Sequence, residues 1–344
     1  MPLRIDISHR LAHFKQPAGT SRGVYHTRDT WIVTVKDIAT GQTGVGECAP
    51  LPDLSCDAMP DYERRLRDIC HLIEKRNRID IGLLRPYPSM LFGLETAFLN
   101  LKNTGDVIFD TPFTRGEEGI PINGLVWMGT AEEMTRRVEE KLNAGFRCVK
   151  LKIGAIDFEQ EVAIIKGIRD RFPADVIQLR LDANGGFSPE DAMRKLERLA
   201  EYDIHSIEQP IRQKQWKSMA EICRCSPIPI ALDEELIGVN LPEMKRLLLD
   251  EIRPAYIILK PSLHGGMYGC EEWLTLAQER GIGSWMTSAL ELNVGLNAIA
   301  QFAAHIYGSS ITMPQGLGTG QLFTDNIPMP LIIKGDKLFR GNLS

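Results

Sequence analysis

The sequence predicts an α/β protein in which a smaller α+β unit precedes a long series of alternating strands and helices. From about residue 121, short β-rich runs alternate with amphipathic helical segments, a pattern that indicates parallel βαβ units. An open doubly wound sheet and a closed (β/α)8 barrel both fit this alternation. The first strand–helix turn lacks the glycine-rich dinucleotide fingerprint, which favours the barrel.

The first 105 residues place strands before helices. Residues 3–7 and 30–37 alternate apolar and polar side chains, as a half-buried antiparallel pair does. Between them we expect a loop over residues 15–28, because this stretch contains glycine, proline and serine. A turn-rich stretch at residues 44–52 follows, and helical periodicity appears over residues 89–101.

The second unit contains eight strand-like runs, the last of them weak: residues 122–126, 148–153, 176–182, 205–210, 228–233, 255–261, 284–290 and 311–313. The helical segments between them carry start signals. Thr130 with Glu133 predicts a capping box, Asp157 predicts a second N-cap, and Ser188 followed by Pro189 predicts a third. Each helix therefore has a defined beginning after its strand.

Composition excludes several classes of protein. The net charge of −5 gives no electrostatic basis for binding nucleic acid or an anionic membrane. No apolar run reaches the roughly 18 residues of a membrane span, and the N-terminus lacks the order of a signal peptide. The seven cysteines form no C-x-x-C pair, which argues against a zinc site or a disulfide scaffold. We therefore expect a cytoplasmic protein with reduced thiols, acting on a small molecule as a monomer or homo-oligomer.

Charged residues stand at the carboxyl ends of consecutive predicted strands: Lys150 and Lys152, then Asp182, Glu208, Asp233 and Lys260. From Lys152 onward the intervals are 30, 26, 25 and 27 residues, each about one βα unit. Barrel active sites lie at this end of the strands, so we expect these side chains to converge. Separate surface charges at loop starts would not repeat at one-unit spacing.

The residue types in the predicted cluster indicate a metal site. Three carboxylates in one cavity repel each other unless a cation lies between them. Oxygen-only ligation suits Mg²⁺, with Mn²⁺ as a possible substitute. Further polar residues near the same strand ends are candidate substrate ligands: Arg180, Asn184, Ser288 and Glu291.

This set of residues resembles the enolase superfamily, and within it the muconate lactonising enzyme subgroup. The resemblance implies a modified (β/α)7β TIM-type barrel at residues 119–317. It also implies an α+β capping domain made of residues 1–118 and 318–344 that carries specificity loops. The tail, with a possible hairpin at residues 331–339, is expected to return to the cap.

The resemblance also implies roles. Members of the superfamily remove the proton α to a carboxylate, and Mg²⁺ stabilises the resulting enediolate. By position, the metal ligands would be the three acidic residues Asp182, Glu208 and Asp233. Lys152 would be the general base, with its pKa lowered by Lys150 and the cation, and Lys260 would lie on the opposite face of the substrate.

Within the subgroup, residues 46–52, the Arg180-x-Asp182-x-Asn184 pattern and residues 316–320 resemble the hydro-lyases. Those enzymes form an aromatic intermediate of menaquinone synthesis by syn dehydration of a cyclohexadiene carboxylate. The alternative is an N-acyl amino acid racemase or a dipeptide epimerase. Dipeptide epimerases usually carry Asp-x-Asp late in the barrel, and residues 288–293 of this chain contain no such motif.

Overall fold

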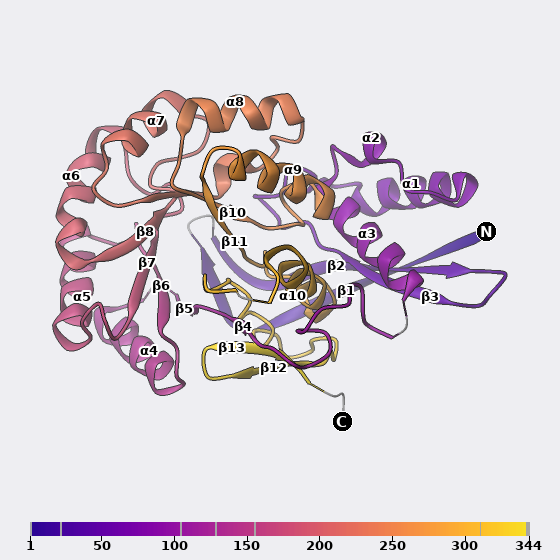
Figure 1. The fold of residues 1–344 in the computed structure, drawn as a ribbon, viewed down its shortest axis with the longest axis horizontal. Helices are drawn as coiled ribbons and strands as arrows, with labels where there is room; N and C mark the ends of the chain where they lie inside the picture. The colour runs from indigo at the N-terminus through magenta and orange to yellow at the C-terminus, as the bar shows by residue number, and fades with distance from the viewer. Residues whose placement is uncertain are drawn as a thin grey trace.

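A computed structural model describes residues 2–20, 23–103, 105–127, 129–154, 156–309 and 311–341. Figure 1 shows two units side by side. A curved parallel sheet with helices α4 to α9 around it forms one unit, and a three-stranded antiparallel sheet with helices α1 to α3 forms the other.

The parallel sheet has the strand order β11-β10-β9-β8-β7-β6-β5, so each strand pairs with the next one along the chain. Its strands are β5 (Gly124–Val126), β6 (Cys148–Lys152), β7 (Gln178–Asp182), β8 (Ile204–Glu208), β9 (Ile230–Leu232), β10 (Tyr256–Leu259) and β11 (Gly283–Met286). The helices are α4 (Ala131–Asn143), α5 (Phe158–Arg171), α6 (Pro189–Leu199), α7 (Trp216–Cys225), α8 (Pro242–Ile252), α9 (Gly266–Gln278) and α10 (Asn293–Tyr307), with short 3-10 turns η1 (Ala200–Tyr202) and η2 (Glu234–Leu236).

The barrel is closed by a very short eighth segment. Gln315 forms a parallel bridge to Ile122, just before β5, and Gly316 forms one to Thr287, just after β11. The Gln315 side chain also accepts a hydrogen bond from the Met286 N–H at 2.7 Å. The modified barrel is therefore confirmed, but the weak strand expected at residues 311–313 is wrong, because the pairing lies a few residues later.

The predicted helix starts are confirmed. Thr130 and Glu133 form the reciprocal capping box of α4. The Asp157 carboxylate accepts backbone N–H bonds at the start of α5, and the Ser188 hydroxyl does so ahead of Pro189 in α6. Caps of this kind contribute about 1 kcal/mol each.

The other unit, called the cap below, consists of β1 (Leu3–Thr20), β2 (Gly23–Asp37) and β3 (Thr43–Cys48) with α1 (Tyr62–Arg76), α2 (Ile81–Leu84) and α3 (Pro88–Lys102). Helix α3 packs very closely on β3. A Cβ at Gly46 would lie 1.8 Å from the Gly93 carbonyl oxygen, so the glycines of residues 44–46 serve this close approach.

The loop expected at residues 15–28 is wrong. Strands β1 and β2 continue their antiparallel pairing through Ala18 and Tyr25, with one register shift between His13 and Ala18. The shift accommodates the Gln-Pro step without ending the ladder, because proline is tolerated where a ladder hydrogen bond is already missing. Arg28 consequently lies inside a strand.

The tail divides between the two units. Phe323 bridges to Phe14 of β1, and Lys15 N–H donates to the Leu322 carbonyl at 2.8 Å. The hairpin of β12 (Leu331–Lys334) and β13 (Lys337–Arg340) instead pairs with β4 (Ile120–Pro121), immediately before β5. Figure 1 shows it below the barrel.

The expectation that residues 331–339 return to the cap is therefore wrong. Strand β4 offers an unpaired edge at the amino-terminal end of the barrel strands, and the hairpin turn packs against Gly145, which precedes β6. We retain as a proposal the division into a cap of residues 1–118 and 318–344 and a barrel of residues 119–317, with the hairpin excepted.

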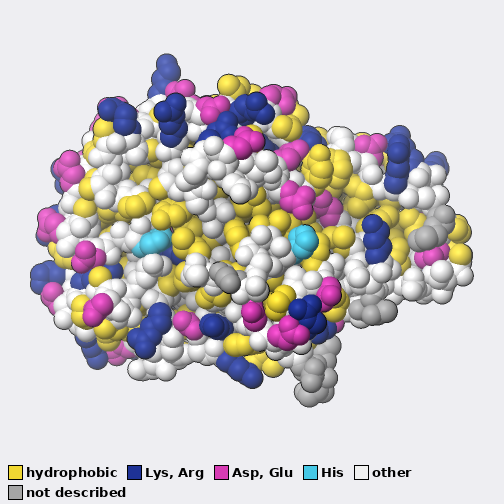
Figure 2. All heavy atoms as spheres, in the orientation of Figure 1, with side chains coloured by type: hydrophobic (Ala, Val, Ile, Leu, Met, Phe, Trp, Pro, Cys, Tyr) yellow, Lys and Arg dark blue, Asp and Glu magenta, His cyan; other side chains and the backbone are white. Residues whose placement is uncertain are grey.

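Side chains of both signs are interspersed on the face shown in Figure 2. All seven cysteines lie within the described residues, and none of them forms a disulfide. Within the same residues, no helix has the length and apolarity needed to cross a membrane.

Cap and barrel are joined by polar contacts to helix starts. The buried carboxylate of Glu47, in β3, accepts the N–H groups of Leu292 at 2.8 Å and Gly295 at 2.7 Å and so caps α10. Glu95 of α3 accepts the N–H groups of Met267 and Tyr268 at the start of α9. Each carboxylate satisfies helix N–H groups that would otherwise lack partners.

We expect Glu47 to make stability pH-dependent. Burial raises its pKa to about 7, although the N–H donors of Gly295 and Leu292 favour the charged form. The folded protein thus holds a proton that the unfolded chain releases near pH 4.5, so the stability contributed by this group falls as pH rises from about 4.5 to 7. The loss is at most about 3 kcal/mol. The side chain in Glu47→Gln cannot ionise, so the variant lacks this pH-dependent loss. The free energy of unfolding of the wild type should therefore approach that of the variant as the pH rises over this range.

Urea unfolding at half-unit pH steps measures the gap in the free energy of unfolding between the two proteins. Glu132→Gln, an exposed position in the first turn of α4, is the control and should follow the wild type at every pH. A gap that widens as the pH rises from 5 to 7 would contradict a raised pKa.

Candidate active site

The residues predicted from strand spacing do converge at the carboxyl ends of β6 to β10. In the sheet register Lys152 lies level with Asp182, and Asp182 lies level with Glu208. Lys152 Nζ donates to Asp182 Oδ2 at 2.6 Å and to Asn184 Oδ1 at 2.7 Å. Lys150 Nζ, two residues lower on the same face, reaches Asp182 Oδ2 at 2.9 Å and Glu208 Oε2 at 2.8 Å.

The other side of the cluster is built on Asp233. Lys260 Nζ donates to Asp233 Oδ2, and His264 Nε2 lies 3.9 Å from Asp233 Oδ1. Next to it, Glu234 Oε1 accepts from Asn184 Nδ2 at 2.9 Å. Asn184 therefore links Lys152 on one side of the cluster to Glu234 on the other.

These groups are buried and determine one another's charge. Burial disfavours ionised Asp182, but the ammonium groups of Lys150 and Lys152 outweigh it and hold its pKa below the usual range. Burial and the charge on Asp182 raise the pKa of Glu208. For Lys260, burial favours the neutral amine, yet the charge on Asp233 prevails and its pKa is raised. In this arrangement lysine ammonium groups neutralise the carboxylates.

The donor set fits a hard divalent cation. Within this cluster, three buried carboxylate oxygens have no hydrogen-bond partner among the described residues: Glu208 Oε1, Asp233 Oδ1 and Glu234 Oε2. Such atoms normally have partners, and oxygen ligands are those that Mg²⁺ prefers. Among the described residues no three acidic, histidine or cysteine side chains already stand as a ready ligand set, and lysines pair with each of Asp182, Glu208 and Asp233.

Of the four predicted substrate ligands, only Asn184 joins the cluster. Arg180 lies inside the barrel, 4.3 Å over the Trp285 ring, and donates to the Pro314 carbonyl at 2.8 Å. Ser288 bonds Thr319 at 2.6 Å between side-chain oxygens. Glu291 accepts from the Ser262 hydroxyl, in the turn after β10, and from the Ala289 N–H of its own loop, so both carboxylate oxygens are engaged within the protein.

Two residues of the cluster were given no role from the sequence. His264 Nδ1 accepts the Lys260 N–H at 2.9 Å, and burial together with the Lys260 charge keeps its pKa well below normal. The only sequence signal for His264 is that it follows Lys260 by four residues, which is a weak signal. Glu234 stands directly beside Asp233, which is the signal that could have marked it.

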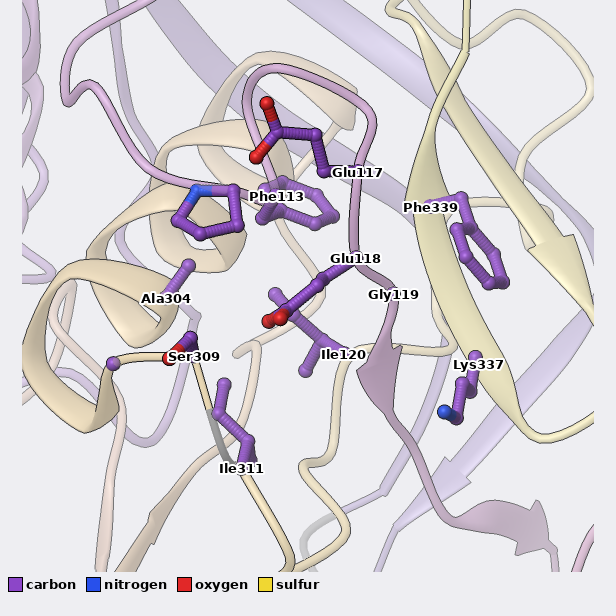
Figure 3. Close-up of a pocket in the computed structure, with 12 residues that line it drawn as sticks. Phe113, Glu117, Glu118, Gly119, Ile120, Ala304, Ser309, Ile311, Lys337 and Phe339 are labelled. Carbon is purple, nitrogen blue, oxygen red and sulfur yellow. The ribbon is translucent and has the colours of Figure 1, made fainter.

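One cavity lies next to the cluster, and another lies at the opposite end of the barrel strands. One of about 400 Å³ lies between cap and barrel and includes Glu234 in its lining, together with Leu54 and Cys56 of the cap. The other, about 330 Å³, lies at the amino-terminal end of the barrel, where Figure 3 shows Phe113, Ile120 and Ile311 opposite Lys337 and Phe339 of the hairpin. The second cavity is at the far end of the strands from the lysines.

Comparisons with known proteins agree with this geometry. The model of the enolase C-terminal domain-like family matches residues 133–327, and that of the MenC N-terminal domain matches residues 21–101. The o-succinylbenzoate synthase of Desulfotalea psychrophila is 45% identical over 97% of this chain and 98% of its own length. The chain belongs to the o-succinylbenzoate synthase family of the enolase superfamily. Membership of the superfamily, predicted from the strand-end residues, is confirmed.

Solved structures of the superfamily have the same fold as this chain. The crystal structure of MenC from Desulfotalea psychrophila LSv54 matches with a TM-score of 0.85 and 42% identity, covering 98% of this chain and 100% of that one. The dipeptide epimerase from Enterococcus faecalis, complexed with Mg and the dipeptide L-Leu-L-Tyr, matches with a TM-score of 0.84 and 18% identity, covering 99% and 98%. At that identity the likeness shows the fold alone.

Proposed function

We propose that this chain is a hydro-lyase that converts 2-succinyl-6-hydroxy-2,4-cyclohexadiene-1-carboxylate to o-succinylbenzoate in menaquinone biosynthesis. The observation that carries the chemistry is the pair Lys152 and Lys260 on either side of a row of buried carboxylates. The full-length similarity to an o-succinylbenzoate synthase supports this substrate over the others handled by the superfamily.

We assign Asp182, Glu208 and Asp233 as the ligands of Mg²⁺, which Mn²⁺ could replace. Enzymes of this superfamily depend on divalent metal ions. When bound, the cation neutralises the second negative charge that the substrate carboxylate gains as its α proton leaves. Its arrival would also compete with Lys152 for Asp182 and with Lys260 for Asp233, since each lysine now shares an oxygen of those carboxylates.

Lys152 then serves as the general base. Its amine takes the proton from ring carbon 1, the electron pair moves into the ring, and the hydroxyl on carbon 6 leaves with that same proton as water. Because the elimination is syn, one group on one face can perform both transfers. Asn184 holds Lys152 in place through its side-chain oxygen, and the Lys150 ammonium group is fixed between Asp182 and Glu208.

Lys260 faces the substrate from the other side. Its charge is anchored by Asp233, and its backbone N–H is fixed by His264. A cation in this position stabilises the delocalised negative charge of the ring by attraction alone. It therefore needs no proton transfer in the dehydration.

A spectrophotometric assay of the purified protein with the cyclohexadiene substrate tests the function. We expect loss of the diene and appearance of the aromatic product with Mg²⁺, no turnover after treatment with EDTA, and recovery when Mg²⁺ is restored. The protein should stay folded in EDTA, because lysines neutralise the site. Full activity in EDTA would exclude a metal-dependent reaction.

The same preparation distinguishes the racemase alternative. In deuterated water a racemase or epimerase exchanges the α proton of an N-succinyl amino acid or a dipeptide, whereas dehydration consumes its substrate. We expect rapid turnover of the cyclohexadiene. Exchange into amino acid derivatives without any turnover of the cyclohexadiene would favour the alternative.

A further inference from the structure

Arg28 is a buried cation that bonds only to backbone carbonyl groups. Its side chain is 1% exposed. Nε donates to the Leu290 carbonyl at 3.1 Å, Nη2 donates to Ala49 at 2.7 Å and Ala289 at 3.3 Å, and Nη1 donates to Pro50. No carboxylate within the described residues is within ion-pair distance of it, although the charges of Glu291 and Glu47 act on it from farther away. A buried guanidinium without such a partner is uncommon, so its placement calls for a role.

The four carbonyl groups belong to two loops that are far apart in sequence. Ala49 and Pro50 follow β3 in the cap, whereas Ala289 and Leu290 follow β11 in the barrel. Leu290 has a φ of +62°, a backbone conformation that side chains with a Cβ rarely adopt. Such a residue keeps its conformation when its surroundings hold it, and Arg28 bonds directly to its carbonyl oxygen.

The cap holds the same barrel loop from two more directions. Glu47 accepts the N–H groups of Leu292 and Gly295, as described above. The side chains of Leu290 and Leu292 pack in a small apolar cluster with residues of β1 and the tail: Ala12, Phe14, Ala18 and Phe323. Residues 288–292, at the carboxyl end of β11, are thus shaped by contacts with the cap.

We infer that Arg28 is a positioning residue: its guanidinium fixes cap residues 49–50 to barrel residues 289–290 and so holds residues 288–292, at the carboxyl end of β11 where barrel active sites lie, in the conformation that binds substrate. The inference rests on the proposed function. Only a planar group with five N–H donors can serve four carbonyls in two loops at once, so lysine cannot replace it fully.

Arg85 provides a matched control. It also joins cap to barrel, through Glu272 at 2.9 Å and the Asn240 carbonyl at 2.7 Å, but its partners belong to α9 and to the segment before α8. An arginine that merely ties the two units together would behave like Arg85. One that shapes the pocket would change substrate binding.

The experiment compares Arg28→Met, Arg28→Lys and Arg85→Met in the full-length enzyme with Mg²⁺. We expect Arg28→Met to lower kcat/KM by about 10²-fold, mainly through KM, because small misplacements of a binding wall have effects of this size. Arg28→Lys should fall between it and the wild type. Arg85→Met should lower the melting temperature and leave KM unchanged. An unchanged KM in Arg28→Met would overturn the inference.

Chemical rescue sharpens the comparison. Millimolar guanidinium chloride should restore KM in Arg28→Met and not alter Arg85→Met, with sodium chloride at equal ionic strength as the reference. If Arg28→Met does not fold, the KM of Arg28→Lys is used instead: a raised KM supports the inference, and an unchanged KM overturns it. An elevated KM that guanidinium leaves unchanged would argue that the loss of the hydrogen bonds from Arg28 to the four carbonyl groups is not the cause of the weaker substrate binding.

Hydrogen exchange supplies a readout that does not need the reaction. Backbone amides in residues 286–296 should exchange faster in Arg28→Met than in wild type, and at the wild-type rate in Arg85→Met. If the wild-type protein failed to turn over the cyclohexadiene, the proposed function would be wrong, but the exchange comparison would still test whether Arg28 positions residues 288–292. Equal exchange in all three proteins would overturn it.

Discussion

Replacing Lys152 with alanine is expected to lower kcat by about 10²–10⁴-fold, the usual contribution of a general base. Lys152 Nζ lies within hydrogen-bond reach of Asp182 and Asn184, and the amine of the neighbouring Lys150 is already held by two carboxylates and so cannot take over proton removal. The measurement is the initial rate of diene loss at saturating substrate and Mg²⁺. Small amines should restore part of the rate, because alanine leaves room where the lysine side chain lay.

Two comparisons separate loss of the base from loss of structure. Lys166→Ala removes an exposed lysine of α5 that pairs with Asp170 and should retain wild-type kcat. Lys260→Arg keeps the cation beside Asp233 and should retain more activity than Lys260→Ala. In a two-base racemase, Lys260→Arg would instead be as inactive as Lys152→Ala in at least one direction. A kcat in Lys152→Ala close to that of the wild type would exclude it as the base.

Asp182→Asn is expected to abolish both metal binding and turnover. Asp182 is fully buried and accepts from Lys150 and Lys152, so the amide removes one proposed metal ligand and leaves two ammonium groups facing a neutral side chain. Removing one partner of a buried ion pair costs about 3–5 kcal/mol. We therefore expect no heat of Mg²⁺ binding in calorimetry and a lower free energy of unfolding in the metal-free protein.

Asp170→Asn is the matched control for this prediction. Asp170 pairs with Lys166 on the exposed face of α5, and surface pairs of this kind contribute about 1 kcal/mol or less. Its metal affinity and activity should equal those of the wild type. Undiminished Mg²⁺ binding by Asp182→Asn would remove Asp182 from the ligand set.

The positions of the site residues could be predicted because the barrel repeats one unit. One strand-end residue per βα unit places Lys152, Asp182 and Glu208 at the same height, and the structure confirms that register. Arg180 lies apart from the cluster for the same geometric reason. It shares the inner face of β7 with Asp182 but lies two residues, about 6.6 Å, lower along the strand.

Contacts between distant loops could not be predicted. The acceptors of Arg28 are carbonyl groups, which every residue has, in loops separated by about 240 positions in the sequence. The sequence predicted a substrate contact for Glu291 and no role for Glu47. In the structure, backbone N–H groups of residues 289–295 donate to both carboxylates. The tail hairpin likewise depended on the free edge of β4, a strand of two residues that the periodicity does not reveal.

A crystal structure of the protein with Mg²⁺ and o-succinylbenzoate tests the central claim most directly. We expect the cation between Asp182, Glu208 and Asp233, the product carboxylate on the cation, and the amines of Lys152 and Lys260 on opposite faces of the ring. Metal bound away from these carboxylates, or a ring that neither lysine approaches, would contradict the account.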